Sequence, residues 1–162
     1  MIALLKNKIK DSGFLNNLKP MDYNVKTSED LKQELIKVFK HKVFSTKENN
    51  HCIIKFHFVL SEFKNEDEDF IKEAVYLVNR QIRKSDKIFK IGEGDFVILL
   101  PNTYFNETES VIRRVKKIIL DFAIKNQKEI NIYFKMFRFT PFTNEDELLR
   151  KLFSKKFQEE KF

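Results

Sequence analysis

Tryptophan is absent from this chain of 162 residues, and cysteine, glycine and proline are scarce, with one, three and three copies. The single Cys52 excludes an internal disulfide. So few glycines and prolines disfavour an all-β protein with many tight turns. No apolar run approaches the roughly 20 residues that span a bilayer, so we expect no membrane insertion. The first residues lack the charge, apolar stretch and cleavage site of a signal peptide, and we expect a cytoplasmic location.

Apolar residues, and phenylalanine above all, are abundant instead. They make up 42% of the chain, including 18 phenylalanines, which is enough for the core of one domain. Lysine and arginine exceed aspartate and glutamate by 31 to 24, which gives a net charge of +7. Because these charges are interspersed rather than gathered in blocks of one sign, we do not expect nucleic acid as the main partner.

Hydrophobic periodicity and capping residues predict an alternation of helices and strands. The expected order is a helix capped by Ser28, a strand over Cys52–Leu60, a helix over Asp69–Ile82, a hairpin of Lys87–Ile91 and Phe96–Leu100, a helix with a capping box from Asn106 to Glu109, a strand over Ile130–Phe139 and a helix capped by Thr143. One β-sheet covered by helices, an α/β (α+β) fold, packs these elements most simply. We expect residues 1–26 to form a helical extension and residues 27–162 to form the domain.

The stretch from Arg83 to Phe96 is the most specific motif of the chain. It runs through Arg83-Lys84-Ser85-Asp86, a strand, and the turn Gly92-Glu93-Gly94-Asp95-Phe96, after which an apolar strand ends at Pro101. This order resembles the centre of a GGDEF domain, the fold of diguanylate cyclases. The resemblance covers about residues 28–157 and implies a central, mostly antiparallel sheet flanked by helices, as in nucleotidyl cyclases.

The resemblance also implies that the usual reaction is lost. The family carries a pair of aspartates on its first strand, one of which holds a divalent metal, and Lys55 and His57 occupy the aligned positions. An acid of the family's signature turn is replaced by Gly94. Because Mg²⁺ requires hard oxygen ligands and phosphoryl transfer depends on that metal, we expect no metal, no cofactor and no catalytic residue. The chain is therefore not expected to be an enzyme.

One ligand site of the family is retained in the sequence. Active cyclases bind their product, cyclic di-GMP, at an RxxD motif before the signature turn, and Arg83 and Asp86 have that spacing. Arg114, with Arg113 beside it, falls where the family recruits a further arginine. Guanidinium groups bind guanine or phosphate oxygens, and a carboxylate accepts from guanine N–H groups. The resemblance thus implies a regulatory domain that senses cyclic di-GMP.

Other interpretations of these residues stay open. Arg83 and Asp86 can be a purely structural pair between a helix and a strand, and Arg113 and Arg114 a solvated helix face. The domain would then be a scaffold that binds a protein partner or itself, without a nucleotide. A residual GTP-binding or cyclase activity is the third hypothesis.

Aromatic and basic residues alternate near the end of the chain. Phe137, Phe139 and Phe142 lie among Lys135 and Arg138. If an edge of the domain is exposed there, such a mixture of apolar and basic groups is a candidate surface for a partner.

Overall fold

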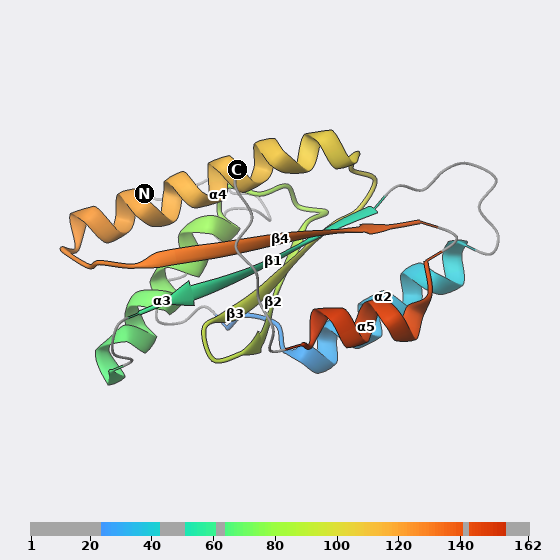
Figure 1. Cartoon of the computed structure of the whole chain (residues 1–162), viewed down its shortest axis with the longest axis horizontal. Helices are drawn as coiled ribbons and strands as arrows, with labels where there is room; N and C mark the ends of the chain where they lie inside the picture. The colour runs from blue at the N-terminus through green and yellow to red at the C-terminus, as the bar shows by residue number, and fades with distance from the viewer. Residues whose placement is uncertain (1–23, 43–50, 61–63, 141–142, 155–162) are drawn as a thin grey trace, which may run out of the picture.

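The computed structural model describes residues 24–42, 51–60, 64–140 and 143–154, which form one layer of strands with helices packed against it (Figure 1). The elements are α2 Ser28–Lys42, β1 His51–Val59, α3 Asn65–Asn79, β2 Lys87–Gly92, β3 Asp95–Leu100, α4 Phe105–Lys125, β4 Asn131–Phe139 and α5 Glu145–Leu152.

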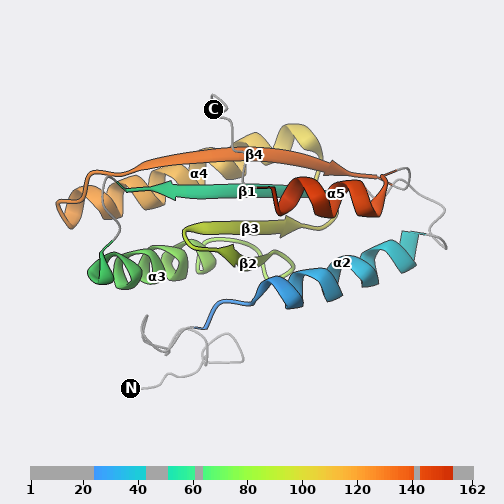
Figure 2. The same ribbon diagram turned by 60° about the horizontal axis from the view of Figure 1, so that its bottom comes forward.

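The strands form one sheet in the order β2-β3-β1-β4, and every neighbouring pair is antiparallel (Figure 2). β1 lies inside the sheet, where Ile54 pairs with Ile98 of β3 on one side and Met136 of β4 on the other. The fold class is therefore confirmed, and so is the position of the hairpin beside the first strand. Since alternate residues of a strand face opposite sides, β1 divides its side chains between two cores.

The larger core lies between the sheet and helices α3 and α4. Four alternate residues of β1 face it, namely Cys52, Ile54, Phe56 and Phe58. Phe56 is fully buried and stacks on its cross-strand neighbours, with centroid distances of 5.4 Å to Phe96 and 5.9 Å to Phe134. Such aromatic pairs add about 0.5–1.5 kcal/mol each beyond the area they bury, so this row ties the three strands together.

The smaller core covers part of the opposite face of the sheet. Leu31 and Leu35 of α2 and Leu148 and Leu152 of α5 are buried there, together with Ile53 of β1. The residues of β1 that follow on the same face are polar, because positions 55 and 57 are lysine and histidine. The packing of α2 and α5 thus leaves one end of this face to charged side chains.

Helix α3 spans Asn65–Asn79 rather than the predicted 69–82. The reason for its early start is Asp67, whose carboxylate accepts from the backbone N–H of Lys64 at 2.7 Å and from the ammonium of Lys128 at 2.6 Å. These two interactions lower the pKa of Asp67, the hydrogen bond from Lys128 most of all. The predicted helix begins after Asp67. In the structure the buried Asp67 side chain caps α3 and joins it to the connection between α4 and β4.

The predicted caps lie one or two residues from the observed ones. The cap of α2 is Thr27 rather than Ser28, since the Thr27 hydroxyl accepts from the Asp30 N–H at 3.3 Å. The cap of α5 is Asn144 rather than Thr143, since the Asn144 side chain accepts from the N–H of residue 147 at 2.9 Å. The capping interaction of α4 joins Tyr104 to Glu107 at 2.9 Å instead of joining Asn106 to Glu109.

Most of the N-terminal extension that we expected to be helical, residues 1–23, lies outside the described part of the chain. Its last residues, 24–26, run along the outer side of β2, where Lys26 forms a parallel bridge to Phe89. The Lys90 N–H donates to the Lys26 carbonyl at 2.7 Å. Among the described helices, none combines the length and the apolar content needed to cross a bilayer.

Candidate functional site

The signature turn docks against the end of β1. Gly94 adopts a φ of 71°, in the left-handed region that favours glycine, and its carbonyl accepts from the Phe58 N–H at 2.9 Å. A Cβ at this position would also lie 3.4 Å from the Phe58 carbonyl oxygen. Glycine therefore suits the backbone conformation of this turn, and the turn brings Asp95 beside His57.

Asp95 is the acid of the turn that reaches the sheet face, and it is paired. Its Oδ1 is joined to Nδ1 of His57, its direct cross-strand partner, and both side chains are 32% exposed. An aspartate held by an imidazole in this way contributes to the docking of the hairpin on β1. The carboxylate is thus engaged by the protein itself.

Lys55 lies one step further along the same face of β1. The residue is 4% exposed, and its Nζ donates to the Ser154 carbonyl at 2.7 Å, just beyond the end of α5. Burial lowers the pKa of Lys55, the nearby Lys135 lowers it further, and Asp95 acts in the opposite direction. Pattern analysis could not predict the contact with Ser154, because the two residues are 99 positions apart.

A divalent metal does not fit these residues. Gly94 contributes no side chain, Asp95 is paired with His57, and Lys55 brings an ammonium that would repel a cation. Within the described residues, no three His, Cys, Asp or Glu side chains are grouped in a way that could hold a metal ion.

A cavity of about 350 Å³ lies next to the signature turn, between α3 and residues 24 and 25. Its charged lining residues are Glu68, Asp69, Lys72, Lys90 and Glu93. The three carboxylates outnumber the two lysines, and a carboxylate-rich lining opposes a triphosphate in the absence of a metal. This cavity is therefore poorly suited to bind a nucleotide.

The RxxD pair forms a clamp beneath the hairpin. The Arg83 Nη2 donates to Asp86 Oδ1 at 2.9 Å, its Nε donates to both carboxylate oxygens at 3.2 Å, and Asp86 also accepts from the Arg83 N–H at 3.0 Å. Nη2 further donates to the Thr103 hydroxyl and, at 3.2 Å, to the Pro101 carbonyl. The pair thus connects the turn before β2 with the turn after β3.

The two members of this pair differ sharply in burial. The side chain of Asp86 is 2% exposed, whereas that of Arg83 is 53% exposed. The hydrogen bonds that Arg83 donates to Asp86 raise the pKa of Arg83, so no change of its charge is expected at neutral pH. Thr103 follows Pro101 closely in the sequence, but only the fold brings its hydroxyl to Arg83.

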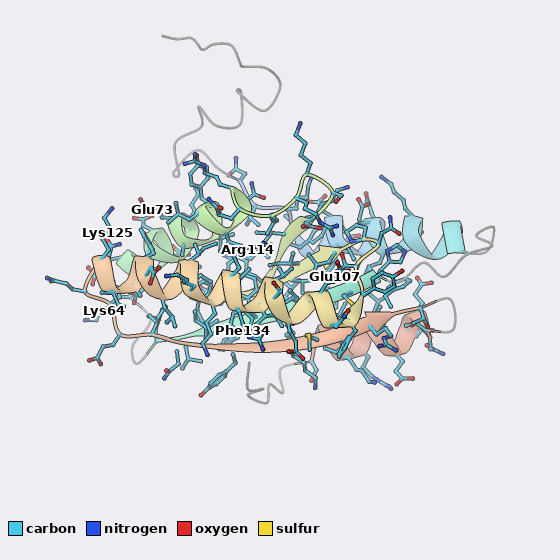
Figure 3. The ribbon with its side chains drawn as sticks, turned by 90° about the horizontal axis from the view of Figure 1, so that it is seen from above. Lys64, Glu73, Glu107, Arg114, Lys125 and Phe134 are labelled. Carbon is cyan, nitrogen blue, oxygen red and sulfur yellow. The ribbon has the colours of Figure 1, made fainter. Side chains whose placement is uncertain are left out.

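The two further arginines of the candidate site lie on α4. Arg113 is exposed and forms an ion pair with Glu109 at 3.3 Å, one helical turn away. Arg114 is also exposed, and Figure 3 places it on the side of α4 toward α3. The structure therefore joins Arg83 to Asp86 directly and presents Arg113 and Arg114 on a solvent-facing helix surface.

We predict that Lys55→Met removes a pH dependence of stability. Because burial lowers the folded-state pKa of Lys55, the unfolded chain binds more protons between that lowered pKa and the ordinary lysine value of about 10.4. The free energy of unfolding of the wild type should therefore rise with pH in this window, relative to the variant. Urea denaturation at pH 7, 9 and 10 measures the difference, and Lys90→Met, at an exposed lysine, serves as the control. Parallel pH profiles of wild type and Lys55→Met would contradict the prediction.

We predict that Arg83→Ala lowers the free energy of unfolding by about 2–3 kcal/mol, because it leaves the buried Asp86 carboxylate without its charged donor. Arg113→Ala is the matched control, since its ion pair with Glu109 is exposed and should contribute at most about 0.5 kcal/mol. Chemical denaturation of both variants gives the comparison. Equal, small losses in the two variants would show that the Arg83–Asp86 pair does not stabilise the fold.

No family model and no curated protein matches the sequence. Solved structures do match the fold. Diguanylate cyclase SiaD of Pseudomonas aeruginosa, in complex with its activator SiaC, aligns with a TM-score of 0.65 and 12% identity over 78% of this chain and 51% of SiaD. The described chain thus spans about half the length of that protein.

Two further structures are GGDEF domains. DgcB of Caulobacter crescentus, crystallised with its coiled coil and cyclic di-GMP, aligns with a TM-score of 0.64 and 9% identity over 80% of this chain and 73% of that one. The GGDEF domain of FimX from Pseudomonas aeruginosa aligns with a TM-score of 0.53 and 10% identity over 74% and 81% of the two chains. At such low identity the likeness shows the fold, and this chain has a GGDEF-like fold.

Proposed function

We propose that this chain is a GGDEF-like domain without diguanylate cyclase activity, which acts as a regulatory or protein-interaction module. The observation that carries the proposal is the burial and hydrogen bonding of Lys55. Its buried ammonium, hydrogen-bonded to the Ser154 carbonyl, occupies the strand position at which the resemblance places a metal-binding aspartate. A positive charge there disfavours the metal ion that phosphoryl transfer requires.

The signature turn supports the same proposal. Gly94 stands where the resemblance expects an acid, and its left-handed backbone, with a φ of 71°, would be strained in a residue that carries a side chain. The neighbouring Asp95 is held by His57. Restoring a metal site would therefore require changes both on β1 and in the turn.

Regulatory binding has precedents among the proteins of similar fold. SiaD was crystallised with an activator protein, and DgcB was crystallised with cyclic di-GMP. The present chain keeps the sheet and the hairpin of those domains while its Lys55 and Gly94 depart from the expected carboxylates. Retention of the scaffold with loss of the acids favours a function in binding.

We predict that the purified chain forms no cyclic di-GMP from GTP in the presence of Mg²⁺ or Mn²⁺. The physical reason is the lack of carboxylate ligands at Lys55 and Gly94. Chromatography of overnight reactions, beside reactions without protein, detects even slow turnover. Product above that background, which disappears in Asp95→Ala, would overturn the proposed loss of activity.

Cyclic di-GMP sensing is a second candidate function. The side chain of Arg83 is 53% exposed although its partner Asp86 is buried, and Arg113 and Arg114 are exposed on α4. Arginines can bind phosphate or guanine oxygens of the ligand without removing Asp86 from its clamp. A site of this kind differs from the one that the sequence suggests, because Asp86 would orient Arg83 rather than contact the ligand.

If the chain senses cyclic di-GMP, calorimetry should show saturable binding that weakens as salt rises, since the contacts are between arginines and phosphates. Arg114→Ala should then weaken binding by about 1.5–3 kcal/mol without unfolding the domain, because Arg114 is exposed. Lys117→Ala is the control, since it removes one exposed charge from the same helix. An absence of binding at high ligand concentration in low salt would leave binding of a protein partner, or self-association, as the function.

A further inference from the structure

The turn between β3 and α4, residues 101–103, is fastened to the start of β1 by two hydrogen bonds. Nδ1 of His51 accepts from the Asn102 N–H at 3.1 Å. The Cys52 thiol donates to the Thr103 carbonyl at 3.3 Å. Because His51 and Cys52 are the first two residues of β1, the position of the turn depends on side chains at one end of that strand.

The same turn supplies two of the acceptors of Arg83. The Nη2 group of this arginine donates to the Pro101 carbonyl at 3.2 Å and to the Thr103 hydroxyl, besides its hydrogen bond to Asp86. The Thr103 hydroxyl in turn donates to the Pro101 carbonyl at 3.0 Å. The turn therefore helps to fix the guanidinium of Arg83, although that side chain is half exposed.

Asn102, at the centre of the turn, has an uncommon backbone conformation. Its φ is 52°, in the left-handed region that few residues other than glycine adopt, although asparagine adopts it more readily than most. Such a conformation persists where surrounding contacts hold it. The hydrogen bond from the Asn102 N–H to His51 is one of those contacts.

This hydrogen bond depends on the protonation of His51. A neutral imidazole that accepts at Nδ1 carries its proton on Nε2, whereas an imidazolium has an N–H at both nitrogens and cannot accept. The side chain of His51 is half-buried, and its ring stands edge-on to that of Phe139 with a centroid distance of 5.6 Å. Burial lowers the pKa of His51, so the folded protein favours the neutral form that accepts from Asn102.

The phenylalanine that packs on His51 belongs to the interior rather than to the partner surface suggested by the sequence. Phe137 and Phe139 are 8% and 0% exposed and lie in the smaller core. Phe142, the third phenylalanine of that expected surface, lies outside the described residues. Phe139 thus gives the His51 ring an apolar neighbour at the edge of the core.

Among the described elements, three bring charged groups to this region. Arg138 of β4 pairs with Cys52 across the strands, Glu107 lies in the first turn of α4, and Arg83 reaches the turn from before β2. Arg138 and Glu107 act in opposite directions on the pKa of Cys52, which burial raises most, so the thiol keeps its proton. Burial alone accounts for the shift of the His51 pKa. Of the side chains that hold the turn, His51 is the one whose charge changes between pH 5 and 8.

We propose that the 101–103 turn is a proton-controlled latch, which is closed while His51 is neutral and opens when protonation of His51 releases Asn102 and loosens the hold of the turn on Arg83. One proton from solvent binds Nδ1 of His51, and the freed Asn102 N–H donates to water instead. The inference concerns regulation and goes beyond the proposed role as a binding module. Acidification would thereby change the freedom of a half-exposed arginine.

The direction of the effect follows from the linkage between opening and proton binding. In the open turn His51 has the ordinary histidine pKa of about 6.5, and in the closed turn its pKa is lower. The open turn therefore binds more protons, and the ratio of closed to open turns falls as the pH drops below about 6.5. Between pH 7.5 and pH 5.5 this fall can reach about tenfold, while above pH 7.5 the ratio should stay constant.

Amide proton exchange followed by NMR tests the latch. Protection factors are taken relative to the exchange rate of an unstructured chain at the same pH. We expect the factor of the Asn102 amide to fall about fivefold to tenfold between pH 7.5 and pH 5.5. The Nε–H group of Arg83 should lose protection in parallel. The factors of Ile112 and Ile119, inside α4, should not change, because the opening is local.

Two substitutions of His51 should hold the latch in its two states. His51→Asn offers a carbonyl oxygen near the position of Nδ1 without a titrating group, and the Asn102 amide should stay protected at both pH values. His51→Phe keeps an aromatic ring against Phe139 but removes the acceptor, and protection should be low at both pH values. His57→Gln removes another imidazole of β1 and should keep the wild-type pH response at Asn102.

Thermal melts show whether each variant is folded, and His51→Asn decides the question even where His51→Phe does not fold. The inference is overturned by a wild type whose Asn102 protection does not depend on pH, or by a His51→Asn variant that keeps the dependence. Loss of protection in α4 together with Asn102 would also overturn it, because the acid response would then be global unfolding. Each of these results leaves the proposed loss of cyclase activity standing, since product formation from GTP measures that separately.

Discussion

The double pairing of β1 is the constraint on which the rest of the structure depends. This strand is hydrogen-bonded to β3 and β4 and is covered by helices on one face and along part of the other, so most of its side chains must be apolar. Phe56 shows how tightly the requirement holds, since it stacks on a phenylalanine of each neighbouring strand. A charged group in this strand is tolerated only with a partner from the protein.

Lys55 is the residue that tests this constraint. It lies in the middle of β1 between Val97 and Lys135, and the Ser154 carbonyl satisfies its ammonium. That hydrogen bond ties the chain just after α5 to the centre of the sheet. A residue that the resemblance first marks as a lost metal ligand thus has a structural role, which explains how the fold tolerates a cation there.

The requirement that a charged or polar group have a partner within the protein also applies to two pairs outside the centre of β1. The Arg83–Asp86 pair and the Asp95–His57 pair both satisfy polar groups within the protein and hold loops onto strands. Their polar groups are already committed, so they are poorly placed to do chemistry on a substrate. Exposed charged side chains such as Arg113 and Arg114 lie at the periphery instead, on the solvent face of α4.

Alternating apolar residues and scarce glycines were enough to predict the strands, the hairpin and the helices within a few residues, because burial on one face imposes a period that the chain carries locally. The motif from Arg83 to Phe96 was enough to predict the GGDEF-like fold. The clamp between Arg83 and Asp86 is also local, since three positions separate the two residues. Ends of helices were predicted less well, because residues such as Asp67 receive their decisive partner, Lys128, from a distant segment.

Only the tertiary structure decided which polar groups are engaged. Sequence alone did not reveal that Lys55 reaches Ser154, that Asp95 is held by His57, or that Thr103 completes the clamp of Arg83. It also placed Phe137 on a candidate surface, whereas the packing of α2 and α5 against the sheet buries that ring in the smaller core. Local patterns report how a segment folds, while the pairing of charges and the burial of a ring depend on segments brought together from far apart in the chain.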